Sequence, residues 1–275
     1  MEKFSFFLLI GISLLTPRAV FSQLMIDKAK VSLTIQSEET IKGEIGVHNF
    51  SSHNVEVKVY PQDFLYLPPF DGRKRFLPPG STKYSCAGWI SFFPQQFQLP
   101  PRGKKKVVYT IRVPRQVSGG YYGVLFFETG SSKIEEKKVN LQIVQRVGCL
   151  FFLETKDKIK QGEVKDISIE GDNLKGKFLN QGNTILLGKG VFYIMSEEGV
   201  VIERGKIDNF YLPPQKETPF VVNLKEVPQG NYIVVFTFDL QKGDVLVKEI
   251  NFLKDKQGNV TILSHQLLEE SLRVR

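Results

Sequence analysis

Three histidines are the residues of this chain best suited to chemistry, because imidazole binds metals and moves protons near neutral pH. They are His48, His53 and His265. His48 and His53 flank a turn and could share a metal ion with a carboxylate, but two histidines without a third placed ligand are a weak metal signal. The sequence therefore predicts no metal and no cofactor.

The short motifs that build most catalytic and nucleotide-binding sites are missing from the chain. It has no glycine-rich phosphate loop, no Gly-x-Ser-x-Gly turn and no Cys-x-x-Cys pair. Gly188-Lys189-Gly190 lacks the rest of any nucleotide motif. A missing motif is weak evidence, so an enzyme is kept as a third hypothesis, but the sequence does not predict one.

The first residues have the pattern of a secretory signal peptide. Lys3 gives a short basic start, an apolar run covers Phe4–Leu15, and Val20 and Ser22 fit the small-residue rule at a cleavage site. We predict that residues 1–22 are cleaved, with an uncleaved anchor as the alternative. No second run of membrane length follows, which predicts a periplasmic or otherwise extracytoplasmic protein without stable membrane insertion after cleavage.

The net charge of +8 is spread along the chain, apart from short clusters at Arg73–Arg75 and Arg102–Lys106. The export signal argues against nucleic acid as the partner. We therefore interpret the charge as a solvated surface, with attraction to an anionic lipid, a glycan or an acidic protein as the alternative.

Two cysteines, Cys86 and Cys149, fall in the exported part of the chain. An oxidising compartment permits a disulfide between them, which could stabilise the fold by about 4 kcal/mol through the entropy of loop closure. Their distance in space is not readable from sequence, so a bridge and two buried thiols are equal alternatives.

A module that occurs twice indicates the domain organisation. Phe97–Pro101 reads Phe-Gln-Leu-Pro-Pro, and Phe210–Pro214 reads Phe-Tyr-Leu-Pro-Pro. Each is followed by a strand-like run and then by a Gly- and Tyr-containing segment, Gly119–Thr129 in the first copy and Gln229–Asp239 in the second. This spacing suggests two tandem β domains of similar plan that bind or scaffold rather than catalyse.

Alternating apolar and polar residues dominate both halves, as expected for antiparallel strands with one face on a core. The pattern predicts an all-β chain with two tandem immunoglobulin-like β-sandwich domains after the signal peptide. We place the domains at 23–155 and 156–260, followed by a tail at 261–275 that is a short helix or a frayed end. Strands are expected at Lys30–Ile35, Ile41–Val47, Asn54–Tyr60, Val107–Val113, Val139–Ile143 and Leu150–Leu153, and at Val164–Ile169, Leu174–Leu179, Gly190–Met195, Val200–Arg204, Asp244–Leu253 and Val260–Leu263.

The segment Gln62–Gly80 is the irregular part of the first domain. Prolines interrupt central ladders, so an edge or a long loop is expected here. Its aromatic residues are expected to cap the core or, alternatively, to form a contact surface. They are Phe64, Tyr66, Phe70 and Phe76.

Residues about 24–155 resemble the N-terminal domain of PapD-like periplasmic pilus chaperones. Lys42–Asn49 is similar to the family's second strand, Gly120–Phe127 to its strand F and Val139–Val144 to its strand G. The Leu-Phe-Phe step at 150–152 leads out of the domain as a Leu-Phe-Tyr step does in the family. The Gly-Gly-Tyr-Tyr-Gly segment also resembles Ig-like domains of bacterial surface and cell-wall proteins.

The resemblance implies that strand G is lent to an incomplete partner subunit. Main-chain hydrogen bonds would supply affinity, and alternate side chains would fill the subunit's pockets. Val139, Leu141 and Ile143 stand where these donor residues would lie. An ordinary strand facing its own core is the alternative.

The resemblance also implies two cations that grip the subunit's terminal carboxylate in the cleft between the domains. Lys30 lies roughly at the first position. The second position falls on Cys149, and Arg146 is the nearest cation. The loop before strand G, Gly130–Lys138, is short and polar, unlike the apolar extension of the long-loop chaperones.

Two functions follow from these observations. The first is a chaperone-like protein that assists assembly of a surface polymer such as a pilus by binding secreted subunits through β-strand addition. The alternative is a non-catalytic structural or adhesive surface protein that binds a protein or a glycan through Gln62–Gly80.

Overall fold

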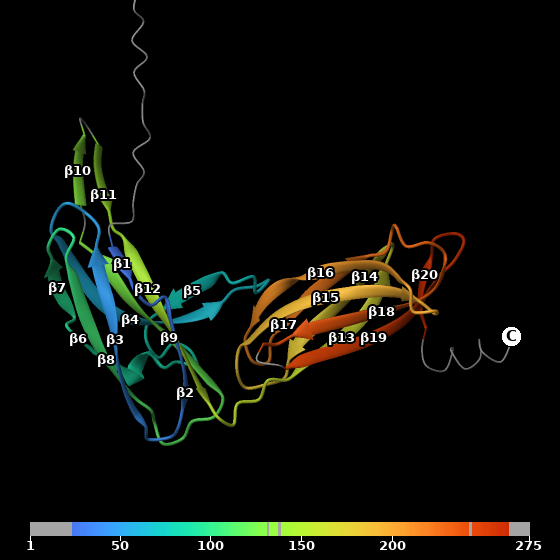
Figure 1. Ribbon diagram of the computed structural model, residues 1–275, viewed down its shortest axis with the longest axis horizontal. Helices are drawn as coiled ribbons and strands as arrows, with labels where there is room; N and C mark the ends of the chain where they lie inside the picture. Colours follow the sequence, from blue (N-terminus) through green and yellow to red (C-terminus); the bar gives the residue numbers. More distant parts are fainter. Residues whose placement is uncertain (1–23, 131, 137–138, 242–243, 264–275) are drawn as a thin grey trace, which may run out of the picture.

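The computed structural model describes residues 24–130, 132–136, 139–241 and 244–263, with the backbone alone for 132–136 and 139–143. The described chain is all-β and forms two β-sandwich domains, which confirms the predicted fold class (Figure 1). The predicted signal peptide, His265 and most of the predicted tail lie outside these residues. Within the described part, no helix has the length and apolarity needed to cross a membrane.

The first domain packs two sheets face to face. Sheet I has the strand order β1-β3-β8-β6, and sheet II has the order β2-β12-β9-β4-β5 with β7 also paired to β4. The elements are β1 (Leu24–Ile26), β2 (Lys30–Ile35), β3 (Thr40–Asn49), β4 (Val55–Tyr66), β5 (Lys74–Leu77), the 3-10 helix η1 (Ala87–Trp89), β6 (Ile90–Phe93), β7 (Gln96–Leu99), β8 (Lys104–Arg112), β9 (Gly120–Thr129) and β12 (Arg146–Thr155). A hairpin of β10 (Ser132–Glu136) and β11 (Val139–Ile143) lies between β9 and β12 in the chain.

The first two strands of the chain lie in different sheets, so the chain crosses from sheet I to sheet II between them. β1 pairs with β3 in sheet I, whereas β2 pairs in parallel with β12 in sheet II. Asp27 holds the crossing, because its amide donates to the Gly46 carbonyl at 3.0 Å and its carboxylate accepts from the Gly46 amide at 2.9 Å. As a result, β2 reaches β12 only from Leu150 onward.

The second domain is an unequal sandwich. Sheet III has the order β13-β14-β17, and sheet IV has the order β16-β15-β18-β19-β20. The strands are β13 (Gly162–Glu170), β14 (Asn173–Asn180), β15 (Leu186–Ser196), β16 (Val201–Leu212), β17 (Glu217–Asn223), β18 (Gly230–Asp239), β19 (Val245–Lys254) and β20 (Val260–Leu263). Residues 261–263, which the sequence assigns to the tail, therefore belong to sheet IV, where they pair with β19.

Two apolar cores form in the described residues. One fills the first sandwich and includes Ile45, Phe127 and Phe151. The other includes Phe178 and Phe236 of the second sandwich and continues across to the outer face of sheet II. The domains are thus joined by a shared apolar interface as well as by the connecting residues 156–161.

The segment Gln62–Gly80, expected to be an edge or a long loop, is mostly a hairpin in which β4 runs on to Tyr66 and pairs with β5, the last strand in the order of sheet II. The sequence argument failed at Pro61, which lies inside β4. The Val59 amide donates to Gln95 on the β7 side of the strand at 2.8 Å, so the Pro61 nitrogen, two residues on, faces the same side. The β7 ladder ends at Lys58, so the proline interrupts no ladder bond.

Both cysteines are buried, unbridged thiols, so the structure has the second of the two alternatives for Cys86 and Cys149. Burial is the main cause that raises the pKa of both thiols, that of Cys149 to about 12.

We expect neither thiol to react with a small disulfide reagent in the native protein at pH 8, because the reagent needs an accessible thiolate. Two thiols should react after denaturation without reductant, which a colorimetric thiol assay measures. Finding no thiol in the denatured, unreduced protein would show that a bridge exists.

Candidate functional site

The hairpin β10–β11 extends the first domain beyond its sandwich. It pairs in antiparallel register, with Val139 opposite Glu136, Leu141 opposite Ile134 and Ile143 opposite Ser132. The Thr129 amide donates to the Gln145 carbonyl at 2.9 Å and so joins the hairpin to the β9–β12 ladder. Figure 1 shows the hairpin projecting from one end of the domain.

One edge of β11 has no ladder partner in the described part of the chain. β11 pairs with β10 alone, and β12 pairs with β9 on one side but with β2 only from Leu150. The edge of β11 from Val139 to Ile143 is therefore open to another strand, whereas β1 lies beside the start of β12, where the Leu24 amide donates to the Gln145 side-chain oxygen at 3.0 Å and the Gln145 side-chain nitrogen donates to the Leu24 carbonyl at 3.2 Å. An open row of backbone donors and acceptors is a template for strand addition.

Lys30 lies beside a hollow between the two domains. It stands opposite Leu150 in the parallel ladder, and its Nζ lies 4.0 Å from the centre of the Phe152 ring. The hollow has a volume of about 300 Å³, and its lining includes Lys30, Lys74 and Lys189. Burial lowers the pKa of Lys74, whose Nζ lies 4.8 Å from the centre of the Tyr66 ring. Three cations over aromatic and apolar walls can hold an anionic group.

Arg146 does not reach this hollow. Its guanidinium lies 4.3 Å from the centre of the Phe126 ring and bonds the Tyr60 hydroxyl at 3.5 Å. Cys149 is turned away from the hollow, because it packs in the first-domain core. Leu150, the next residue, occupies the outward position beside Lys30.

Sequence reasoning found Lys30 but missed Lys74 and Lys189. Lys74 belongs to the basic cluster Arg73–Arg75, which is the only signal that marked it. Lys189 carries no such signal, since it comes from β15 of the second domain and meets the hollow only through domain packing.

The aromatic residues of Gln62–Gly80 pack in or against the apolar core that continues from the second domain across the outer face of sheet II. Phe64, Tyr66 and Phe70 are buried, and Phe76 is partly buried against the same core. Tyr66 stacks on Tyr211 with ring centres 5.0 Å apart. Of the two interpretations of these residues, the structure agrees with the one in which they cap a core. That core forms the interface between the domains.

The hairpin tip adds hydrogen bonds to this interface through its main-chain carbonyls. The Tyr211 amide donates to the Phe70 carbonyl at 2.8 Å, and the Thr218 hydroxyl donates to the Pro69 carbonyl at 3.0 Å. The β4–β5 hairpin therefore fixes the first domain onto β16 and β17.

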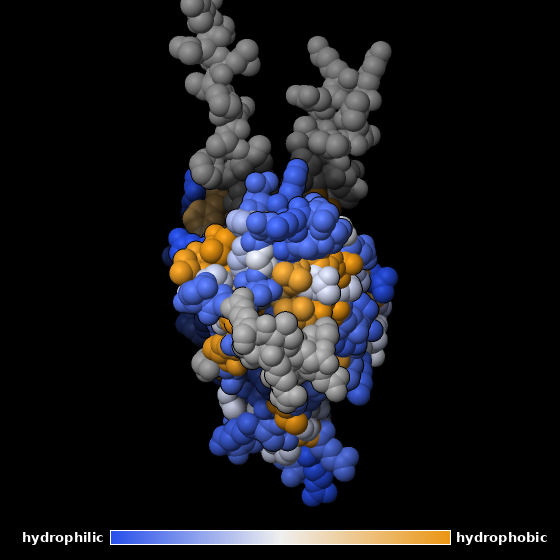
Figure 2. All heavy atoms as spheres, turned by 90° about the vertical axis from the view of Figure 1, so that its right-hand side faces the viewer, coloured by the Kyte–Doolittle hydropathy of each residue, from blue (hydrophilic) through white to orange (hydrophobic). Residues whose placement is uncertain are grey.

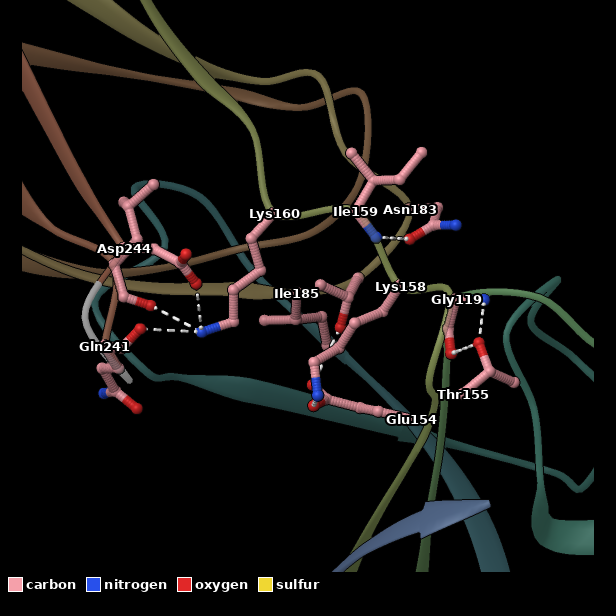
Figure 3. Close-up of polar contacts among 12 residues, drawn as sticks. Gly119, Glu154, Thr155, Lys158, Ile159, Lys160, Asn183, Ile185, Gln241 and Asp244 are labelled. Carbon is pink, nitrogen blue, oxygen red and sulfur yellow. Dashed lines mark hydrogen bonds and ion pairs between the residues drawn. The ribbon is translucent and has the colours of Figure 1, made fainter. Parts of the chain in front are cut away.

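Polar contacts fix the connection between the domains (Figure 3). Lys160 Nζ donates to the carbonyls of Leu240 at 2.9 Å and Gln241 at 3.0 Å and lies 3.4 Å from the Asp244 carboxylate. The Ile159 amide donates to the Asn183 side chain at 2.7 Å. These contacts tie the connecting residues to the second domain, and Gln241 among them also lines the hollow.

A buried tyrosine completes the interface. The Ile185 amide donates to the Tyr122 hydroxyl at 2.8 Å, and the Thr184 hydroxyl lies 2.8 Å from the same oxygen. Thr184 in turn donates to Glu154 at 2.9 Å, and Lys158 pairs with Glu154 at 2.8 Å. Burial raises the pKa of Tyr122, so its hydroxyl stays protonated. These contacts link β9 and β12 of the first domain to residues 184–185 of the second domain.

The histidines do not assemble a metal site in the described residues, where no three of His, Cys, Asp and Glu gather around a common point. The His48 ring lies parallel to Phe50 at 6.2 Å. His53 contributes its carbonyl to Asn49 at 2.8 Å, which is a structural contact.

The sequence matches no protein-family model and no curated protein, but solved structures match the fold. The crystal structure of the class 5 fimbriae chaperone CfaA superposes with a TM-score of 0.52 at 13% identity, over 82% of this chain and 98% of CfaA. The fold is that of the PapD-like pilus chaperones. A chaperone–tip adhesin complex of CFA/I fimbriae biogenesis gives a TM-score of 0.48 at 15% identity, over 83% of this chain and 98% of that chain.

The crystal structure of the YadV chaperone gives a TM-score of 0.44 at 9% identity, over 84% of this chain and 100% of that chain. At these identities the likeness establishes the PapD-like architecture alone. The residues compared above with the family's strand F form β9, and those compared with its strand G form β11.

Proposed function

We propose that this protein is an extracytoplasmic, chaperone-like protein that binds secreted subunits of a surface polymer through β-strand addition. The observation that carries the proposal is the open edge of β11, which pairs with β10 alone in the described residues. A subunit strand laid along this edge would gain a row of main-chain hydrogen bonds, and the alternate residues Val139, Leu141 and Ile143 would supply specificity.

The hollow supplies the second half of the proposal. Lys30 lies on β2, beside β12, so a strand that runs along the open edge toward Leu150 approaches the hollow at its end. A terminal carboxylate there would meet Lys30 together with Lys74 and Lys189. In our proposal these two lysines replace Arg146, which lies on the Phe126 ring instead.

A surface protein that recognises a partner through the Gln62–Gly80 aromatics is less well supported. Those rings are already in contact with the second domain, so they offer little surface to a partner. The open edge of β11 has no comparable cover in the described residues.

The experiment is affinity capture from a periplasmic extract of the source cells, followed by binding measurements with the captured subunit. Changing Lys30 to Glu is expected to weaken binding about tenfold or more, because it places a like charge beside a buried carboxylate. Lys42→Glu, on the exposed outer side of sheet I, is the matched control and should leave the Kd unchanged. Equal affinities for the wild type and the Lys30 variant would contradict the role of the hollow.

A further inference from the structure

The outer face of sheet I is basic. The four strands of this sheet contain five cations and a single acid, Glu44, which pairs with Lys106 at 2.7 Å. The cations are Lys42, Lys104, Lys105, Lys106 and Arg112. A further cation, Arg102, lies exposed in the turn that precedes β8. The basic cluster Arg102–Lys106 of the sequence therefore lies on and beside this sheet, and strand addition at β11 does not use it.

The register of sheet I places cations and apolar residues side by side on this face. Two rows of paired residues cross the sheet and point outward: Met25, His48 and Lys104 in one row, and Glu44, Val108 and Phe93 in the other. Lys106 lies between the two rows, opposite Gly46. Val47 and Val107, which alternate with these residues along the strands, are buried in the core.

The apolar side chains of this face protrude into solvent. Phe93 is 77% exposed, and Met25 and Val108 are each 49% exposed. Phe50, which follows β3 and stacks on the His48 ring, is also exposed. Apolar groups that are this exposed leave solvent only when a partner covers the face.

Lysine between the apolar residues favours a lipid surface over a protein as this partner. The buried part of a protein–protein interface is depleted of lysine. Basic and large apolar side chains occur together where a protein lies on an anionic bilayer, because the apolar groups enter the headgroup layer and the cations stay at the phosphates. The outer face of sheet I has this mixed composition, since Lys106 separates its two rows.

The far end of the second domain provides a contrast. Hydrophobic residues reach the surface there as well, as Figure 2 shows. Val200 and Val201, at the tip of the β15–β16 hairpin, are exposed. Their neighbours in the chain are Glu197, Glu198 and Glu203. These acids would repel an anionic surface, so the cations of sheet I decide which of the two exposed regions fits a lipid bilayer.

We infer that the outer face of sheet I binds the surface of an anionic lipid bilayer. Phe93, Val108 and Met25 enter the headgroup layer, and Lys104 and Lys106 meet the lipid phosphates. The second domain packs on the outer face of sheet II, on the other side of the first sandwich. The hollow between the domains lies on that side too, so a membrane-bound molecule keeps it accessible.

The test is co-sedimentation of the exported chain, residues 23–275, with lipid vesicles at low ionic strength. Vesicles of phosphatidylglycerol and phosphatidylcholine should bind the protein, whereas vesicles of phosphatidylcholine alone should not. Each Lys or Arg near an anionic surface strengthens binding about fivefold, so Lys104→Gln with Lys106→Gln should weaken binding about 25-fold.

The matched control removes the same charge elsewhere. Lys225→Gln with Lys256→Gln, two exposed positions of the second domain, should bind the anionic vesicles nearly as well as the wild type. An equal loss in both double variants would overturn the inference, because net charge alone would then account for binding. Failure of the wild type to bind anionic vesicles would overturn it as well.

A reporter on an apolar side chain locates the contact. Phe93→Trp adds a second tryptophan to Trp89, and its emission should move to shorter wavelength when anionic vesicles are added. The wild type, with Trp89 alone, and Val200→Trp should show no such shift. A shift confined to Val200→Trp, or vesicle binding without a shift at Phe93→Trp, would place the contact elsewhere and contradict the inference. Capture of an acidic protein through Lys104 and Lys106, without vesicle binding, would contradict it too.

Discussion

Replacing Leu141 and Ile143 by aspartate is expected to abolish subunit capture while the protein stays folded. Strand addition places alternate side chains of β11 in apolar pockets of the subunit. Burying an unpaired carboxylate in such a pocket costs several kcal/mol, so the Kd should rise about 100-fold or more. β11 pairs with β10 alone in the described chain, so the thermal midpoint should change little. Pull-down and calorimetry with the captured subunit measure the effect.

The matched control changes the two intervening positions of the same strand. Asn140→Asp with Gln142→Glu adds the same charge to β11 but on its other face, because successive residues of a strand point to opposite faces. This variant should bind nearly as well as the wild type. If both double variants bind equally, or if the leucine and isoleucine variant still captures the subunit, the side chains of β11 do not carry recognition.

Gly119→Ala is expected to destabilise the protein by about 2–5 kcal/mol. Gly119 has φ +85, and a Cβ there would lie 2.3 Å from the Asn183 carbonyl oxygen of the second domain. The left-handed backbone costs an alanine about 1–2 kcal/mol, and the overpacking adds about 1–3 kcal/mol. Gly119 also exchanges hydrogen bonds with Thr155, so the residue cannot move away without breaking the end of β12. Urea unfolding followed by tryptophan fluorescence measures the loss.

Gly80→Ala separates the two causes of this loss. Gly80 has φ +80, close to that of Gly119, but its Cβ would have no atom within 4 Å. We expect only the backbone cost, about 1–2 kcal/mol. A similar loss of unfolding free energy in both variants would show that the closeness of Asn183 to Gly119 adds no cost to an alanine at this position.

The alternation of apolar and polar residues predicted the strands well, because each strand of a sheet that has one face on a core carries this alternation in its own residues. The expected strand Lys30–Ile35 is β2, and the expected strand Val139–Ile143 is β11. The pattern failed where neighbours decide the outcome. Pro61 lies inside β4 because the strand beside its nitrogen has already ended, and a single sequence does not show where a partner strand ends.

The candidate site was predictable only in part for the same reason. The alternation of apolar and polar residues in β11 can be seen in the sequence, and the resemblance to the chaperone family placed Lys30. The position of Arg146 depends on the Phe126 ring beneath it, and Lys189 reaches the hollow from the other domain. These contacts join residues far apart in the chain, so no local spacing shows them.

Hydrogen exchange of the protein with and without its captured subunit tests strand addition most directly. The account predicts that binding slows exchange of the β11 amides, with little change in sheets III and IV. Slowed exchange elsewhere, with the β11 amides exchanging as fast as in the unbound protein, would contradict it.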